Sequence, residues 1–208
     1  MTQMIVALDV DDPMLWHSVF HACRRAGVTF FKINLRSFFV MADPLAFMRA
    51  NKCDVFLDLK LYDTRDTVHA VADSAFDLGA RFLTVHATPS MLNAAMRARP
   101  PGDYHKVLAV EHLTDTGKVL TQLLPFDADG IVCSVASALH VRPATQKIIV
   151  CPGIRPLTTS SAIVGAHVSP ATPSEARAAG ADFIVVGRPI VDAQDPAAAA
   201  RAIMEEIT

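Results

Sequence analysis

The sequence predicts an α/β protein whose single domain is a (β/α)8 barrel, the TIM-barrel class. Segments typical of strands and of helices alternate along the whole chain of 208 residues, and there are eight of each. Eight strand–helix units fill nearly the full length of the chain. That length is near the lower limit for a barrel of this class. One barrel over residues 1–208, without a second domain, is therefore expected.

The predicted strands are short apolar runs that are rich in β-branched and aromatic residues. They lack the regular polar alternation of a half-exposed strand, which is typical of parallel strands buried on both faces. The expected strands cover residues 4–10, 29–34, 55–60, 82–86, 106–111, 130–134, 147–151 and 182–187.

The predicted helices lie between these runs and carry recognisable end signals. Several have a proline at or near the first turn, where its missing N–H removes no hydrogen bond. Three have a glycine suited to a left-handed cap at or directly after their C-terminal end: Gly27, Gly79 and Gly180. The expected helices cover residues 13–26, 37–51, 64–79, 89–99, 117–125, 135–141, 173–180 and 189–207.

A doubly wound open sheet is the alternative fold with the same alternation of elements. Such sheets usually carry a glycine-rich phosphate-binding turn directly after the first strand. Here the first strand runs into Asp9, Val10, Asp11 and Asp12, a segment without glycine. The barrel is therefore favoured.

The composition excludes several classes of partner. Half of the residues (51%) are hydrophobic, and the net charge of -2 provides no basic patch for nucleic acid. No apolar run approaches the roughly 20 residues that cross a bilayer, and the N-terminus lacks a signal pattern. The four cysteines form no CxxC pair, which favours buried free thiols. We expect a cytoplasmic protein that binds neither membranes nor nucleic acid.

In a barrel of this class, functional groups lie at the C-terminal ends of the strands. Those positions carry charges of both signs here, which packing alone would not require. After the seventh strand, residues 154–172 form a long segment rich in Thr, Ser and Pro, which is typical of a lid or a ligand clamp. The candidate positions are Asp9, Lys32, Asp58, Lys60, His86, Glu111, Ser134, Pro152, Gly153, Gly187 and Arg188.

The segment from the third strand into the next helix carries the strongest chemical signal. Side chains alternate along a strand, so Asp58 and Lys60 should point to the same face. Asp63 follows the strand and Thr67 comes one helical turn later, so these two should share a helix face. Carboxylates nearby would keep Lys60 protonated and in place. A purely structural salt-bridge cluster is less favoured, because buried ion networks stabilise less well than apolar packing.

At these residues the sequence resembles the orotidine 5'-phosphate decarboxylase family, over the whole chain. The Asp-x-Lys-x-x-Asp core at residues 58–63 is shared with sugar-phosphate relatives of the same superfamily. Its combination with Pro-Gly-Ile-Arg-Pro and Gly-Arg-Pro, in this order, is more specific. The matching segments are residues 7–10, 31–32, 58–68, 84–87, 129–134, 152–156 and 180–189.

The resemblance implies decarboxylation of orotidine 5'-phosphate to UMP in pyrimidine biosynthesis, with no metal and no organic cofactor. Lys60 would protonate C6 of the pyrimidine, and Asp58 would stand beside the substrate carboxylate. Asp63 and Thr67 would reach into the active site of the partner subunit. A homodimer would therefore be the working unit.

The resemblance also assigns the positions that bind the rest of the substrate. Asp9 and Lys32 would bind the ribose hydroxyls. The backbone of Gly187 and the guanidinium of Arg188 would hold the phosphate, because both offer N–H donors to an anion. The pair Pro152–Gly153, at the end of the seventh strand, completes the candidate substrate-binding set.

The chain departs from the family pattern in the loops that contact the substrate. Where the family usually has Asp-Ile-Pro-Asn-Thr, this chain has Thr64 and Arg65 at the second and third positions. Where the family usually has Leu-Thr-Ser, this chain ends the segment with Asp115. Asn34 replaces a glycine, and residues 157–172 contain no counterpart of the phosphate-loop glutamine. The pattern fits either a divergent member with the ordinary reaction or one that acts on an altered pyrimidine nucleotide.

Two other functions are compatible with the sequence. A magnesium-dependent sugar-phosphate lyase or decarboxylase could use Glu111 with Asp58 around the metal. Such relatives tend to place a carboxylate near the end of the second strand, where this chain has Lys32, Ile33 and Asn34. A barrel that only binds a phosphorylated ligand is also compatible with the fold. For single residues, Asp9 could cap a helix and Arg188 could lie in a plain turn.

Overall fold

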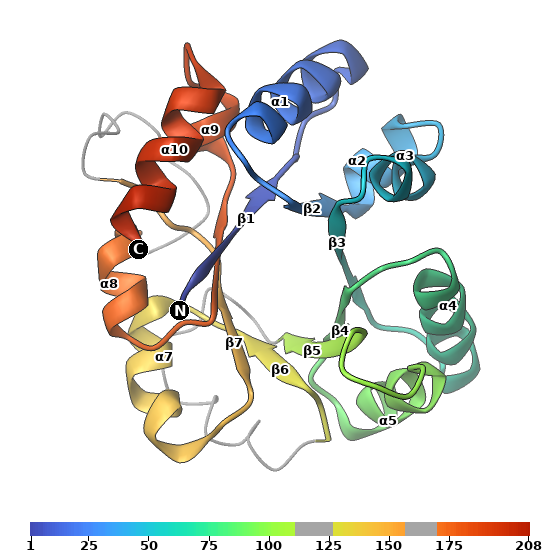
Figure 1. Ribbon diagram of the computed structural model, residues 1–208. Coiled ribbons are helices and arrows are strands. Elements are labelled where there is room, and N and C mark those ends of the chain that lie inside the picture. The colour runs from blue at the N-terminus through green and yellow to red at the C-terminus, as the bar shows by residue number, and fades with distance from the viewer. Residues whose placement is uncertain (111–126, 157–169) are drawn as a thin grey trace.

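The computed structural model describes residues 1–110, 127–156 and 170–208. In this part of the chain, eight parallel strands form a closed barrel in which each strand pairs with the next and β8 pairs with β1. Helices surround the ring of strands (Figure 1). The structure confirms the predicted TIM barrel and excludes the open sheet. None of the helices in the described ranges has the length and apolar character needed to span a membrane.

The strands and helices follow the predicted order. The strands are β1 (Gln3–Ala7), β2 (Phe30–Asn34), β3 (Asp54–Leu61), β4 (Phe82–His86), β5 (Lys106–Val110), β6 (Gly130–Val132), β7 (Ile148–Cys151) and β8 (Phe183–Val186). The helices are α1 (Pro13–Arg25), α2 (Leu35–Val40), α3 (Pro44–Ala50), α4 (Arg65–Asp77), α5 (Pro89–Ala98), α7 (Val135–Val141), the 3-10 turn η1 (Arg142–Ala144), α8 (Pro173–Ala178), α9 (Arg188–Val191) and α10 (Pro196–Glu206).

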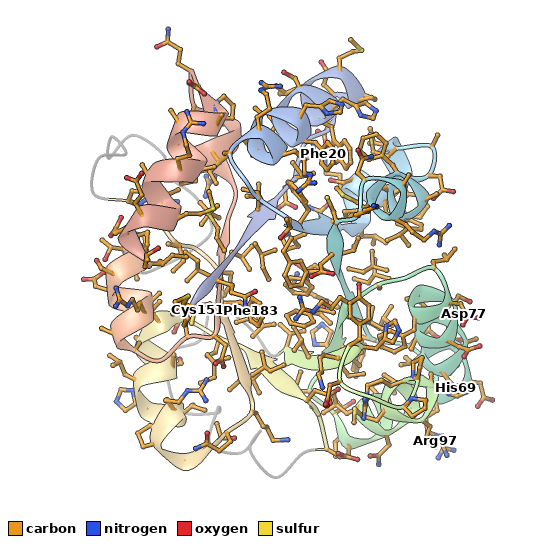
Figure 2. All side chains as sticks on the ribbon, viewed as in Figure 1. Phe20, His69, Asp77, Arg97, Cys151 and Phe183 are labelled. Carbon is orange, nitrogen blue, oxygen red and sulfur yellow. The ribbon has the colours of Figure 1, made fainter. Side chains whose placement is uncertain are left out.

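Aromatic side chains fill the barrel interior toward its N-terminal end. Phe30, Phe82 and Phe183 each begin a strand, and the ring of Phe82 meets each of the other two edge to face at 5.0 Å. Figure 2 shows Phe183 inside the ring of strands, whereas Asp77 lies on the outer side of α4. Apolar rings occupy the N-terminal end of the barrel interior. Polar side chains of the interior are therefore expected at its C-terminal end.

Two predicted helices are wrong in extent, because each is divided in two. The helix expected over residues 37–51 is α2 followed by α3, and the helix expected over residues 189–207 is α9 followed by α10. In both cases the second helix begins at a proline, Pro44 or Pro196. A residue before proline avoids the helical conformation, and the preceding Asp43 or Asp195 instead caps the new helix through its carboxylate.

Other boundaries shift by a few residues, and some predictions lie outside the described residues. The glycines predicted as left-handed caps have φ of 96°, 95° and 79°, at Gly27, Gly79 and Gly180, which confirms them. Strand β1 ends at Ala7, so Asp9 lies in the following loop. The predicted helix 117–125 and the end of the fifth predicted strand fall in the undescribed range.

Candidate active site

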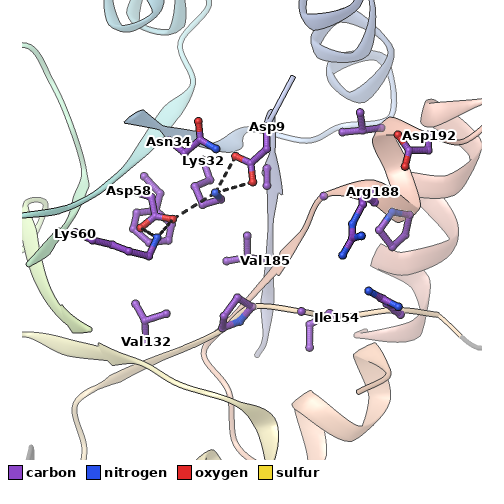
Figure 3. Close-up of a pocket in the computed structure, with 18 residues that line it drawn as sticks. Asp9, Lys32, Asn34, Asp58, Lys60, Val132, Ile154, Val185, Arg188 and Asp192 are labelled. Atoms are coloured by element: carbon purple, nitrogen blue, oxygen red, sulfur yellow. Dashed lines mark hydrogen bonds and ion pairs between the residues drawn. The ribbon is translucent and has the colours of Figure 1, made fainter. Parts of the chain in front are cut away.

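A cavity of about 410 Å³ opens at the C-terminal end of the barrel (Figure 3). Strand ends and the loops that follow them supply its walls, as expected for this class of fold. It is lined by Ala7, Asp9, Lys32, Asn34, Phe56, Asp58, Lys60, Val132, Pro152, Gly153, Ile154, Arg155, Val185, Gly187, Arg188, Pro189, Val191 and Asp192.

Four charged side chains of alternating sign form a chain along one wall of this cavity (Figure 3). The Nζ atom of Lys32 lies 2.8 and 2.9 Å from the two carboxylate oxygens of Asp9, and 3.3 Å from Oδ2 of Asp58. The Nζ atom of Lys60 lies 2.7 Å from both oxygens of Asp58. The structure thus joins four predicted site residues into one network, which we call the charge array.

The middle of the charge array is buried, and its outer lysine is more accessible. The side chains of Lys32 and Asp58 are 9% and 11% exposed, whereas that of Lys60 is 39% exposed. Strand register produces this arrangement: Ala7 pairs with Lys32, and Asn34 pairs with Asp58. Ends of neighbouring parallel strands meet at one edge, so residues far apart in sequence become neighbours there.

The ionisation of the buried pair follows from its neighbours. Burial alone raises the pKa of Asp58, but the ammonium groups of Lys32 and Lys60 and hydrogen bonds from Lys60 and Thr84 hold it below its ordinary value. Burial alone lowers the pKa of Lys32, but the carboxylates of Asp58 and Asp9 outweigh that effect and raise it. Both groups therefore stay charged at neutral pH.

This ionisation predicts a pH dependence of stability for Asp58→Asn. Because the folded-state pKa of Asp58 is depressed, its carboxylate stabilises the folded state above the unfolded pKa of about 3.9. That contribution disappears as the pH falls through the folded-state pKa. We expect wild type to exceed Asp58→Asn in free energy of unfolding by a constant amount around neutrality, and by less in acid. Urea unfolding between about pH 3 and pH 8, a range that spans the titration of a carboxylate, measures this difference.

The exposed Asp73 of α4 supplies the control for that comparison. Asp73→Asn removes one carboxylate without touching the charge array, so its difference from wild type should stay small across the range. A difference between wild type and Asp58→Asn that does not shrink in acid would contradict the assignment of a depressed pKa to Asp58.

The local backbone at Lys60 differs from a regular strand. Its φ is +48°, and the register between β3 and β4 shifts between Leu57 and Leu61. A non-glycine residue with positive φ is uncommon and costs conformational energy. Asp58 and Lys60 were predicted to point to the same face, and their side chains contact each other. A distorted strand, and not simple alternation, holds them there.

The opposite side of the cavity offers donors for an anion. Figure 3 shows Arg188 and Asp192 across the cavity from Asp58 and Lys60. Arg188 is the first residue of α9 and follows Gly187, while Gly153 has φ of +78°, a conformation that favours glycine. Guanidinium and backbone N–H groups suit a phosphate. The predicted Pro152, Gly153, Gly187 and Arg188 all line this cavity.

Some cavity residues were missed in the sequence prediction. Arg155 lines the cavity and was available in the Pro-Gly-Ile-Arg-Pro segment, directly after β7. Asp192 lies beyond the last strand end, and no local pattern marked it. Thr84 lies in the interior of β4 and contacts Asp58 without lining the cavity. A strand threonine carries no sequence signal of that contact.

Asp63 and Thr67 do not line the cavity of their own chain. Both are exposed, and Asp63 precedes α4, whose N-cap is Thr64. The predicted shared helix face is therefore wrong, because the Asp63 carboxylate accepts the N–H of Thr64 at 2.6 Å and the helix starts two residues later.

Two helix caps and the possibility of a metal site can be judged from the described residues. Asp12, and not Asp9, caps α1, so the alternative role for Asp9 is wrong. Ser134 caps α7 through its hydroxyl. Within residues 1–110, 127–156 and 170–208, no group of three His, Cys, Asp or Glu side chains could hold a metal ion. Glu111, Asp115 and residues 157–169 of the predicted lid lie outside these ranges.

The fold and the site define a class. A closed parallel barrel whose cavity at the strand ends is lined by lysines, carboxylates and arginines belongs to the TIM-barrel class of enzymes. Within that class, the chain belongs to the orotidine 5'-phosphate decarboxylase / HUMPS family, whose model matches residues 2–203.

Individual relatives agree with this membership. The chain is 40% identical to orotidine 5'-phosphate decarboxylases of Methylorubrum populi and Methylorubrum extorquens, and in each case 99% of this chain and 95% of the relative are covered. It is also similar to the crystal structure of orotidine 5'-phosphate decarboxylase from Lactobacillus acidophilus, with a TM-score of 0.80, 28% identity and 99% of both chains covered.

Proposed function

We propose that this protein decarboxylates orotidine 5'-phosphate to UMP in pyrimidine biosynthesis, without a metal or an organic cofactor. The observation that carries the proposal is the charge array from Asp9 through Lys32 and Asp58 to Lys60, at the cavity of a member of this family. Its four cysteines are free thiols, in keeping with the cytoplasmic location that the proposal includes.

The charge array suits the electronic demand of this reaction. When the bond from C6 to the carboxylate breaks, carbon dioxide leaves and the electron pair stays on C6. The ammonium of Lys60 stabilises this developing charge and transfers a proton to C6, after which Lys60 regains a proton from water. The Asp58 carboxylate, fixed between two lysines, holds Lys60 in position before the substrate arrives.

The remaining cavity residues would position the nucleotide. Arg188, Arg155 and the backbone at Gly187 and Gly153 line the cavity and are suited to the phosphate. Of these, Arg188 lies across the cavity from Lys60 (Figure 3). Asp9 would accept hydrogen bonds from the ribose hydroxyls, and Lys32 would donate to them. Binding energy gained at these remote groups can offset the cost of placing the substrate carboxylate beside Asp58.

A homodimer would complete the site with Asp63 and Thr67 of the partner subunit. Both residues are exposed in the single chain, and Tyr62, next to Asp63 in the sequence, is 71% exposed. A dimer that covers this segment would remove the Tyr62 ring from water.

Turnover of orotidine 5'-phosphate, followed as loss of the orotate ultraviolet band, tests the proposal. We expect rapid loss that EDTA does not change. Loss that EDTA abolishes would instead indicate a magnesium-dependent enzyme related to the sugar-phosphate members. No loss in a folded dimer would contradict the proposal and direct the search to other phosphorylated ligands.

A further inference from the structure

Thr84 lies behind the charge array and contacts two of its members. The residue is fully buried on β4, and its side chain does not line the cavity. Its Oγ1 atom lies 2.9 Å from the backbone nitrogen of Lys60 and 2.9 Å from Oδ1 of Asp58. One hydroxyl therefore contacts both residues that the proposed reaction needs most.

The direction of both hydrogen bonds is fixed by chemistry. A backbone N–H can only donate, so the Thr84 oxygen accepts from Lys60. An ionised carboxylate can only accept, so the Thr84 hydroxyl donates to Asp58. A threonine or a serine can make both bonds at once, whereas valine, which has nearly the same shape, can make neither.

The backbone that Thr84 supports is the strained part of β3. Lys60 has positive φ, and Thr84 lies opposite the register shift, between Leu83 and Val85, which pair with Leu57 and Leu61. At such a distortion the regular ladder is interrupted. The Thr84 side chain supplies an acceptor for the Lys60 amide there. Strained backbone persists only where surrounding contacts hold it.

We propose that Thr84 is a positioning residue for the decarboxylation: its hydroxyl fixes the Lys60 backbone and the Asp58 carboxylate relative to each other. The inference rests on the proposed function, because it concerns the geometry of that reaction. It assigns a role to a buried residue that touches no substrate. Since both bonds share one oxygen, their loss would release Lys60 and Asp58 together.

The first experiment compares Thr84→Val and Thr84→Ser in turnover of orotidine 5'-phosphate. A displacement of about 1 Å at a reacting group can cost on the order of a hundredfold in rate. We expect kcat of Thr84→Val to fall roughly 10- to 100-fold, with KM within about threefold of wild type because the phosphate and ribose contacts remain. Thr84→Ser should recover most of kcat.

Thr2→Val is a matched control for the loss of a buried threonine hydroxyl. Thr2 is 8% exposed and donates to the carbonyl oxygen of Ala181 at 2.8 Å, at the N-terminal side of the barrel. Its replacement should lower stability without changing kcat. Equal loss of kcat in Thr2→Val and Thr84→Val would show that general destabilisation, and not positioning, explains the effect.

A second measurement does not depend on turnover. Hydrogen exchange at the Lys60 amide, followed by NMR, should be slow in wild type and Thr84→Ser and fast in Thr84→Val. If Thr84→Val does not fold, Thr84→Ser and Thr84→Ala differ by the same hydroxyl and replace the pair in both measurements.

The two proposals fail in distinguishable ways. If wild type does not consume orotidine 5'-phosphate, the proposed function fails, and slow exchange that depends on the hydroxyl would still establish the contact with Lys60. If wild type is active and the variants without the hydroxyl keep both its kcat and its exchange protection, the inference about Thr84 is overturned.

Discussion

Lys60→Ala is expected to lose turnover of orotidine 5'-phosphate almost completely while it still binds the product UMP. The ammonium of Lys60 is both the proposed proton donor and the positive charge nearest the developing carbanion. General acids typically contribute 10²- to 10⁴-fold, and a preorganised charge contributes a further large factor, so kcat should fall at least about a thousandfold. Single-turnover kinetics would measure the residual rate.

Binding should change little in this variant, because the groups suited to phosphate lie across the cavity, around Arg188. We expect the Kd for UMP, measured by calorimetry, to stay within about tenfold of wild type. Loss of turnover and of UMP binding together would indicate that Lys60 is a binding residue. Residual turnover near the wild-type rate would contradict the proposed proton donor.

Lys52→Ala is a close control for this substitution. Lys52 also has positive φ, at +53°, and is exposed between α3 and β3, away from the cavity. Both variants therefore place alanine in the same unfavourable backbone region and remove one positive charge. Lys52→Ala should keep the wild-type kcat, so a loss confined to Lys60→Ala reports on chemistry.

Asp63→Ala is expected to be nearly inactive as a homodimer, although Asp63 lies outside the cavity of its own chain. In the proposed dimer, each site combines Lys60 of one subunit with Asp63 of the other. Removing that carboxylate takes a negative charge from the neighbourhood of Lys60 and of the substrate carboxylate. We expect a loss of kcat of the order seen for a missing catalytic group, roughly 10²-fold or more.

Mixing Asp63→Ala with Lys60→Ala should restore activity. In a two-fold symmetric dimer that combines the two variants, one site lacks both residues and the other site is intact. Random reassociation of equal amounts should therefore recover about a quarter of wild-type activity. No recovery, with subunit exchange verified by native mass spectrometry of labelled chains, would contradict the shared site.

Much of the fold was predictable because the signals for its elements are local. Apolar runs marked the strands, and glycines such as Gly79 marked helix ends. The failures are also local in origin. Pro44 and Pro196 divide helices that were predicted as continuous, because the residue before a proline leaves the helical conformation.

Residues of the candidate site could be predicted where they lie at the ends of predicted strands. Asp9, Lys32, Asp58 and Lys60 follow or end predicted strands, and barrel closure brings strand ends together. The role of Thr84 was not predictable. A threonine in a buried strand has a common packing role, and only the register shift opposite it makes its hydroxyl a partner of Lys60.

The eightfold order of elements and the positions where charges follow the strands can be read from the amino-acid sequence. The contacts among those charges appear only in the folded barrel: Asp58 lies between Lys32 and Lys60, whereas Asp63 lies outside the cavity. Helix and strand patterns depend on neighbours along the chain, while contacts between charges depend on barrel closure and strand register. Both of these are set by packing of the whole molecule.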